Sequence, residues 1–173
     1  MRICGIDPGS NGAICVLDSN DPAYIALLDL KKNTIHETYE WLRIEVTNNS
    51  KNVDYYLGKE EFHHPIRQIW VEDIHSMYGM SAKSNFGFGR NLGIVAAVAT
   101  IITKVPPKTV APKVWQKYIG VTAKGKAIKK QVAQIASGLY PKAELHGKRG
   151  GLLDGRSDAL MIAHYGLHNK EKL

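Results

Sequence analysis

The sequence predicts an α/β fold: a mixed five-stranded sheet, with three antiparallel strands followed by parallel additions, flanked by helices. Three observations predict it. Apolar runs of strand length dominate the amino-terminal part, helical periodicity dominates the carboxyl-terminal part, and strand-like runs recur between helical segments. The chain of 173 residues, 44% hydrophobic and 23% charged, contains no repeat and no linker-like stretch, so one domain over residues 1–173 is expected.

Three strands open the chain, at about 2–7, 12–18 and 23–30. The turns "PGSN" and "SNDP" join them into an antiparallel meander, and the glycine of the first turn permits positive φ. Cys4 and Cys15 lie inside the first two strands without the spacing of metal ligands. Both are therefore expected to be buried free thiols.

The middle of the chain alternates helical and strand-like segments. In order, these are a helix from Thr34 into the mid-40s, a polar surface insertion at 47–65, a strand at 67–73, a glycine-bearing loop at 77–85, and a long helix ending near Ile102. The first and fourth strands are separated by a meander and a crossover helix. They can therefore lie parallel and adjacent in the sheet.

The last third of the chain predicts one short strand and three helices. They are a strand at 105–111, a helix at 112–120 with Pro112 in its first turn, an amphipathic helix at 124–137, and a helix starting around Gly155. In the amphipathic helix the apolar side is formed by Ile128, Val132 and Ile135, and the opposite side by Lys126, Lys129 and Lys130. This helix is expected to pack on the core and expose its lysines.

Charge is divided unevenly along a chain whose net charge is +7. Residues 1–100 hold 9 Lys and Arg against 12 Asp and Glu, whereas residues 101–173 hold 14 against 4. Such a basic half suggests a polyanionic partner, most plausibly nucleic acid. No apolar run approaches the roughly 20 residues of a membrane span and no signal-peptide pattern opens the chain, so a soluble cytoplasmic protein without membrane contact is expected.

Two acidic side chains stand where parallel strands are predicted to end. Asp7 closes the first strand and Glu72 the fourth, which places both at the same edge of the sheet, where open α/β sheets bind ligands. Asp73 follows Glu72 directly and points to the opposite face, because strand side chains alternate. A simpler interpretation of Asp7 is a turn aspartate bonded to its own backbone.

A second acidic pair opens the last predicted helix. Asp154 and Asp158 stand four residues apart, so they share one face. Asp154 could simply cap the helix by accepting a bond from the amide of Arg156 or Ser157. Asp158 precedes the apolar run 159–163, so its charge needs a partner, and a metal ion would be one.

Carboxylates from three separate segments suit a pair of hard divalent cations. Such cations take oxygen ligands and, about 4 Å apart, clamp an in-line displacement at phosphorus. Carboxylates accept both Mg²⁺ and Mn²⁺. Together with the basic half, this set makes a phosphodiester-cleaving nuclease the leading interpretation.

Three motifs carry a resemblance to a known family. "GIDPGSNGAICVLD", "WVEDIHSMYGMSAKSNFGFGRNLGIVAAV" and "DGRSDALMIAHYG" are similar, in this order, to the motifs of RuvC-type Holliday junction resolvases of the RNase H-like superfamily. The D-G-x-x-D form of the third motif resembles phage-borne members, which would act in the host cytoplasm. The resemblance implies an RNase H-like fold and a homodimer that nicks two opposed strands of branched DNA.

Carried onto this chain, the resemblance implies catalytic metal ligands at Asp7, Glu72, Asp154 and Asp158, holding two Mg²⁺ or Mn²⁺ ions. One departure is the spacing of the last pair, which many relatives place three residues apart; here Gly155 holds the three-back position. In the homodimer, Gly89 and Gly93 on the long helix would permit close helix approach; the alternative is tight packing of these glycines on the sheet.

DNA contacts are predicted for two sets of residues. His75 falls where the family often has an aromatic that helps open the junction, and it could share a stacking role with Tyr78, although both could be plain loop residues. Phosphate contacts are predicted at Lys124, Lys126, Lys129, Lys130, Lys148, Arg149 and Arg156.

Three other interpretations were weighed. The first motif also resembles the phosphate loop of actin-like and sugar-kinase ATPases, but a second lobe does not fit in 173 residues, so no nucleotide cofactor is expected. A junction-binding protein with a degenerate site would not require four acids. A ribonuclease H or transposase of the same superfamily would be separated from a junction enzyme by its activity on RNA–DNA hybrids.

Overall fold

The computed structural model describes residues 1–47, 66–73 and 81–169. Five strands form a single sheet in the order β3-β2-β1-β4-β5. Their bounds are β1 (Arg2–Asp7), β2 (Ala13–Asp18), β3 (Ile25–Asp29), β4 (Ile66–Glu72) and β5 (Lys108–Val110). The first three pair antiparallel, and β1–β4 and β4–β5 pair parallel, which confirms the predicted mixed sheet.

Two predicted strands are longer than the observed ones. The predicted strand at 23–30 is shorter at both ends, and Leu30–Lys32 forms the 3₁₀ helix η1. Of the predicted strand at 105–111, only Lys108–Val110 (β5) is observed as a strand. Pro106 and Pro107 lack the backbone N–H that a sheet ladder needs, which accounts for its late start. The predicted surface insertion lies almost wholly outside the described residues.

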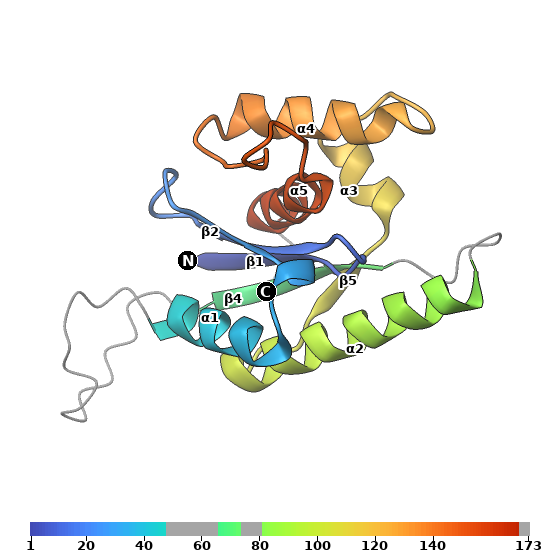
Figure 1. Ribbon diagram of the computed structural model, residues 1–173. Coiled ribbons are helices and arrows are strands. Elements are labelled where there is room, and N and C mark those ends of the chain that lie inside the picture. Colours follow the sequence, from blue (N-terminus) through green and yellow to red (C-terminus); the bar gives the residue numbers. More distant parts are fainter. Residues whose placement is uncertain (48–65, 74–80, 170–173) are drawn as a thin grey trace.

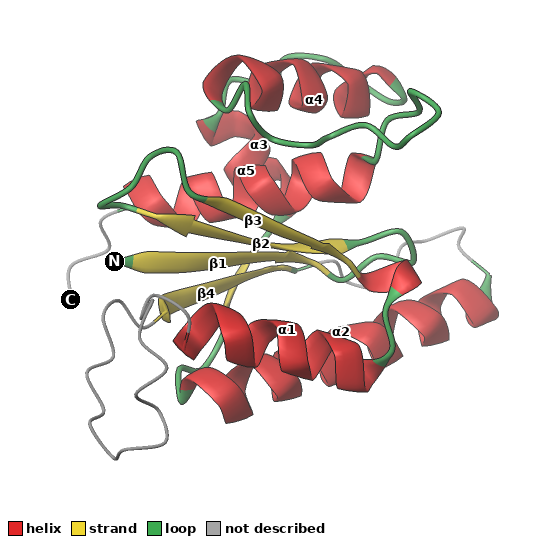
Figure 2. Ribbon diagram, turned by 60° about the vertical axis from the view of Figure 1, so that its left-hand side comes forward, coloured by secondary structure: helices red, strands yellow, loops and turns green. Residues whose placement is uncertain are grey.

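Five α-helices cover the two faces of the sheet, as Figures 1 and 2 show. They are α1 (Ile35–Thr47), α2 (Ala82–Thr103), α3 (Pro112–Tyr118), α4 (Ala127–Leu139) and α5 (Asp154–His168). Helices α3, α4 and α5 lie on one face, and α1 and α2 on the other. Each layer encloses its own core cluster, because strand side chains alternate between the faces.

Buried cysteines illustrate this alternation. Cys4 belongs to the core under α1 and α2, and Cys15 to the core under α5. Both are free thiols, as predicted, and burial raises the pKa of each thiol.

Helix α5 packs directly on β1. Gly5 makes this possible: a Cβ atom there would lie 2.3 Å from the backbone nitrogen of Ala163 and 2.4 Å from the carbonyl oxygen of Ala159. The close approach brings the first turn of α5, which carries two acids, to the edge of the sheet where β1 ends.

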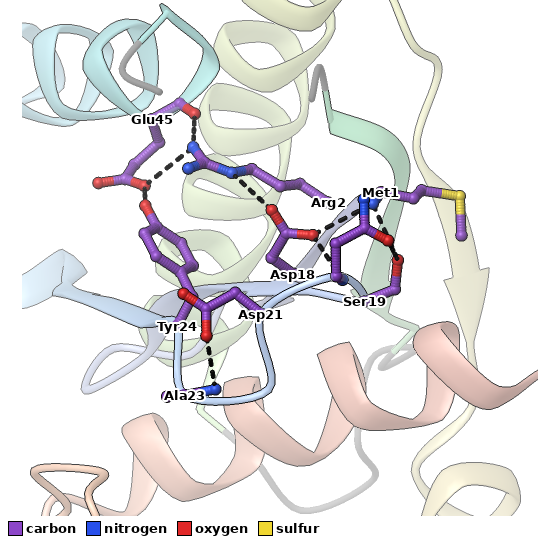
Figure 3. Close-up of polar contacts among 9 residues, drawn as sticks. Met1, Arg2, Asp18, Ser19, Asp21, Ala23, Tyr24 and Glu45 are labelled. Carbon is purple, nitrogen blue, oxygen red and sulfur yellow. Dashed lines mark hydrogen bonds and ion pairs between the residues drawn. The ribbon is translucent and has the colours of Figure 1, made fainter. Parts of the chain in front are cut away.

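A buried polar network fixes the opposite end of the sheet, as Figure 3 shows. The guanidinium of Arg2, 1% exposed, lies 3.5 Å from Asp18 and 3.7 Å from the carboxylate of Glu45. It also stacks 4.3 Å from the ring centroid of Tyr24, whose hydroxyl donates to Glu45. The network joins β1, β2 and α1 far from the acidic edge, so it contributes to stability rather than to chemistry there.

Helix α2 has an apolar surface that the rest of the described chain leaves largely open. Phe86 and Ile101 are 75% and 61% exposed. The segment Asn85–Thr103 is also long and apolar enough to cross a membrane by length and composition alone, which is weak evidence for a membrane helix.

Candidate active site

Asp7 and Glu72 lie at the carboxyl ends of the adjacent parallel strands β1 and β4, as predicted. Both are buried, with 8% and 5% of their surface exposed. The backbone N–H of Gly9 donates to Asp7 Oδ1 at 2.8 Å. Asp7 therefore accepts the backbone bond expected of a turn aspartate. Its charge also raises the pKa values of Glu72 and Asp158.

Glu72 is held by a partner that the sequence did not reveal. The indole Nε1 of Trp115, itself fully buried in α3, donates to Glu72 Oε1 at 3.0 Å. Glu72 and Trp115 are 43 positions apart, and no periodic pattern connects them. The contact arises because β5 pairs with β4 and delivers α3 beside the end of β4.

The first turn of α5 supplies the second acidic pair. Asp154 is the first residue of the helix, and the flanking cap residue is Leu153, whose carbonyl accepts bonds from the amides of Arg156 and Ser157. No cap bond from the Asp154 side chain accompanies it, so the capping interpretation of Asp154 is wrong. Its carboxylate instead contacts the Lys129 ammonium.

Glycine at position 155 explains the unusual spacing of the acidic pair. A Cβ atom there would lie 2.1 Å from the carbonyl oxygen of Asn11, in the turn that follows Asp7. An aspartate at position 155, three residues before Asp158, would collide with that turn. The carboxylates must therefore occupy positions 154 and 158, which flank the contact.

The buried acids repel one another. Burial, and next the charge of Asp7, raise the pKa of Glu72 to about 7. The pKa of Asp7 is raised mainly by burial, against the bond from Gly9. Burial, and then the charges of Asp7 and Glu72, raise that of Asp158 well above its ordinary value. Such a cluster is stabilised by any cation that enters it.

One cation of the protein already lies at this cluster. Lys129 extends from α4 to Asp154, and its charge lowers the pKa values of Asp7, Glu72 and Asp158. The contact with Asp154 is the main cause of a raised pKa at Lys129. Lys129 is predicted to contact phosphate; its side chain is 63% exposed, and its ammonium also lies beside the acids.

The donor chemistry of the four acids fits hard divalent cations. Asp7, Glu72, Asp154 and Asp158 offer only carboxylate oxygens, which Mg²⁺ and Mn²⁺ prefer. Within residues 1–47, 66–73 and 81–169, however, no three His, Cys, Asp or Glu side chains form a ready-made metal site. A bound cation would have to draw the carboxylates together against their repulsion.

The predicted phosphate contacts fall into two groups. Lys124, Lys126, Lys130, Lys148 and Arg149 are exposed around the start of α4 and the loop before α5. Arg156 is different: its guanidinium donates to both oxygens of Asp29, at 2.6 and 3.0 Å, and to the carbonyl of Glu144. This ion pair ties α5 to β3. His75 and Tyr78 lie outside the described residues.

Gly89 and Gly93 do not pack on the sheet. Both are exposed, and a Cβ atom on either would meet nothing within 4 Å. The alternative that explained these glycines by sheet packing is therefore wrong, and their small size serves no contact within the described part of the chain.

The raised pKa of Glu72 predicts a pH-dependent stability. In the fold its carboxyl stays protonated up to about pH 7, whereas in the unfolded chain it ionises near 4.5. The unfolded state therefore binds fewer protons in this window, and the free energy of unfolding falls as pH rises, by roughly 3 kcal/mol for this group. Urea unfolding at pH 5 and pH 7.5 in chelator measures the loss.

Glu72→Gln removes this titrating group and should reduce the pH dependence, leaving the part that the raised pKa values of Asp7 and Asp158 contribute. Mg²⁺ should restore the stability of the wild type at pH 7.5. Equal pH dependence in wild type and variant would contradict the assignment.

Comparisons with known proteins support the fold. No family model matches the chain, and no curated protein matches it. Among solved structures, the Thermus thermophilus RuvC structure matches at 20% identity and a TM-score of 0.52, covering 96% of this chain and 95% of that one. T. thermophilus RuvC in complex with a Holliday junction substrate matches at 17% identity and the same TM-score, covering 94% and 90%. The chain has a RuvC-type, RNase H-like fold.

Proposed function

We propose that this protein is a metal-dependent, structure-selective endodeoxyribonuclease that nicks four-way junctions, and that it also cuts other branched DNA. The observation that carries the proposal is the cluster of acids at the sheet edge, with Asp7 and Glu72 buried, Asp158 partly buried and the pKa values of all three raised. An exposed basic surface lies beside it. A RuvC of the same fold is known in complex with a Holliday junction.

The four acids would hold two Mg²⁺ or Mn²⁺ ions, which when bound activate water and stabilise the departing 3′ oxygen. Trp115 orients Glu72, and the Gly9 amide orients Asp7. Lys129 lies between this cluster and the basic surface. Its ammonium contacts Asp154 and can move from that carboxylate to the substrate phosphate when DNA binds. The surrounding apolar core excludes water from the inner carboxylates.

The basic surface would hold the phosphates of the DNA arms. Its members are Lys124, Lys126, Lys130, Lys148 and Arg149, with Lys129 at its inner border. Arg156 is predicted to act indirectly, because Asp29 and Glu144 engage its guanidinium. His75 and Tyr78 stay candidates for stacking against bases at the junction.

The test is incubation of synthetic four-way junctions with the protein and Mg²⁺, followed by mapping of the nicks. We expect paired nicks with 5′-phosphate and 3′-hydroxyl ends, which DNA ligase seals. Ca²⁺ should support binding with little cutting, since it prefers looser and higher coordination. RNA–DNA hybrids and forked duplexes belong in the same assay.

Four outcomes would contradict the proposal. Unsealable 3′-phosphate ends or full activity in chelator would exclude the two-metal reaction. Tight junction binding without any cutting would leave a structural junction-binding protein. Preference for RNA–DNA hybrids would indicate a ribonuclease H activity.

The exposed face of α2 supports a homodimer. Residues spaced three or four apart form one apolar stripe with small residues at its centre: Phe86, Gly89, Gly93, Ala97 and Ile101. Small central residues let two helix backbones approach closely, and a second copy of the same stripe is self-complementary across a two-fold axis. Paired nicks on a symmetric junction need such a dimer.

Gly93→Glu places a charge at the centre of this stripe without a clash inside the chain, so it should convert the dimer to a monomer. Light scattering after size exclusion should give twice 19.2 kDa for the wild type and 19.2 kDa for the variant. Gly138→Glu, on the open face of α4, is the matched control and should stay dimeric. A monomeric wild type that binds lipid vesicles through α2 would contradict the dimer.

A further inference from the structure

A hollow of about 440 Å³ lies between η1, the start of α1, and α2. Its polar lining includes Ser10, Lys31, Asn33, Arg90 and Asn91, and apolar side chains such as Ile94 and Val95 complete it. The hollow is on the α1–α2 face of the sheet, away from the basic surface of α4. Of the predicted DNA contacts that the structure describes, none lines this hollow.

Charge in this hollow favours an anion. Lys31 and Arg90 line it and are exposed, and its lining contains no acid. The Glu37 carboxylate lies next to this lining, because it accepts bonds from the backbone N–H and the hydroxyl of Thr34, so the charge at the hollow is that of two cations and one anion. The two cationic side chains are therefore the groups that would attract a ligand.

Hydrogen bonds connect the hollow to the acidic edge. Leu30, which lines the hollow, donates its backbone N–H to the carbonyl of Gly12, and Lys31 Nζ donates to Asn11 Oδ1 at 3.1 Å. Gly12 in turn donates to the carbonyl of Gly9, whose amide binds Asp7. The turn after β1 is thus the shared wall of the active site and the hollow.

A second hollow, of about 490 Å³, lies on the other side of this turn. It is lined by Asn11, Lys31 and Asp154 among others, so it reaches the acidic cluster directly. Lys31 lines both hollows. A strand leaving the acids can therefore follow one path past Lys31 toward Arg90.

We propose that the hollow between η1 and α2 binds a nucleotide of the cleaved DNA strand, near the scissile phosphate. Lys31 and Arg90 contact its phosphate, and the base lies against Ile94 and Val95. The amide of Asn91 faces its polar edge, together with Oδ1 of Asn33, whose Nδ2 donates to the carbonyl of Asp29. The volume of about 440 Å³ lies within the range of roughly 300–1,000 Å³ that is usual for small-molecule sites. This inference rests on the proposed nuclease function and adds a strand path that the basic carboxyl-terminal half does not supply.

The test measures binding of the full chain to a fluorescent four-way junction and to a short single strand, in Ca²⁺ to suppress cutting. The double variant Lys31→Ala/Arg90→Ala should raise Kd about tenfold and lower the log–log salt slope by about 1.5, for two phosphate contacts. The control Lys104→Ala/Lys142→Ala removes two exposed lysines outside the hollow and should change Kd less than about twofold.

Asn91→Trp fills the hollow while keeping both cations. It should weaken binding several-fold with an unchanged salt slope, because a base is displaced and no phosphate contact is lost. Circular dichroism checks that each variant is folded.

Equal losses in the double variant and its control, or full affinity in Asn91→Trp, would overturn the nucleotide site while leaving the nuclease proposal intact. A wild type that binds no DNA would overturn both.

Discussion

Asp7→Asn should reduce junction cleavage at least about 10³-fold, or ~4 kcal/mol of transition-state stabilisation, while leaving junction binding close to that of the wild type. The change removes one charged oxygen ligand from the acidic cluster, in which the charge of Asp7 raises the pKa values of both Glu72 and Asp158. The basic surface is untouched, so the phosphate contacts stay. Single-turnover cleavage in Mg²⁺ and anisotropy binding in Ca²⁺ measure the two effects separately.

Asp21→Asn is the matched control for the turn role of Asp7. Asp21 accepts a bond from the N–H of Ala23, two residues on, just as Asp7 does from Gly9, but it is exposed and lies with the Arg2 network of Figure 3. It should cut at the wild-type rate. Near-normal cleavage by Asp7→Asn would show that Asp7 only stabilises the turn and would contradict the proposal that it is a metal ligand.

Asp7→Asn should also make the metal-free protein more stable at neutral pH. One of several mutually repelling buried charges is lost, while the amide oxygen can still accept the bond from Gly9. A variant that is inactive and more stable is the signature of a functional charge, whereas loss of a structural residue lowers both activity and stability.

Gly155→Ala should have the largest effect on assembly of the site. Its Cβ would lie 2.1 Å from the carbonyl oxygen of Asn11, so either the turn after β1 or the start of α5 must move. We expect a loss of about 3 kcal/mol in the free energy of unfolding and a cleavage rate reduced more than tenfold. Thermal or urea unfolding and the junction assay measure the two effects.

Gly138→Ala supplies the comparison, because position 138 is also helical and a Cβ there meets nothing within 4 Å. It should be neutral or more stable by a few tenths to about 1 kcal/mol, as alanine is the better helix former. If both alanine variants behaved alike, the close contact between α5 and the turn after β1 would not be what positions the acids.

The sequence was most informative where the signal was local. The ends of the apolar strand runs placed Asp7 and Glu72, and helical spacing paired Asp154 with Asp158, because each inference needs only a few neighbouring residues. The parallel pairing of β1 with β4 followed from the crossover between them.

The missed contacts are all long-range. Trp115 binds Glu72 and Arg156 binds Asp29 across 43 and 127 positions, distances over which no period operates. Net charge also misled: the amino-terminal half is acidic as a whole, so Lys31 and Arg90 did not stand out until the fold placed both at the lining of one hollow.

The separation of the sheet into two differently covered faces bears on how such an enzyme could be re-engineered. Asp7 and Glu72 act electrostatically on Asp158 of α5, whereas the stripe proposed for self-association belongs to α2, which lies on the other face of the sheet from α5. Subunits inactivated at the acids, for example by Asp7→Asn, but with an intact α2 stripe should then still form dimers with active subunits. Under the proposed function, such a hybrid would cut one strand of a junction and leave the opposed strand intact, so it would nick where the wild type resolves.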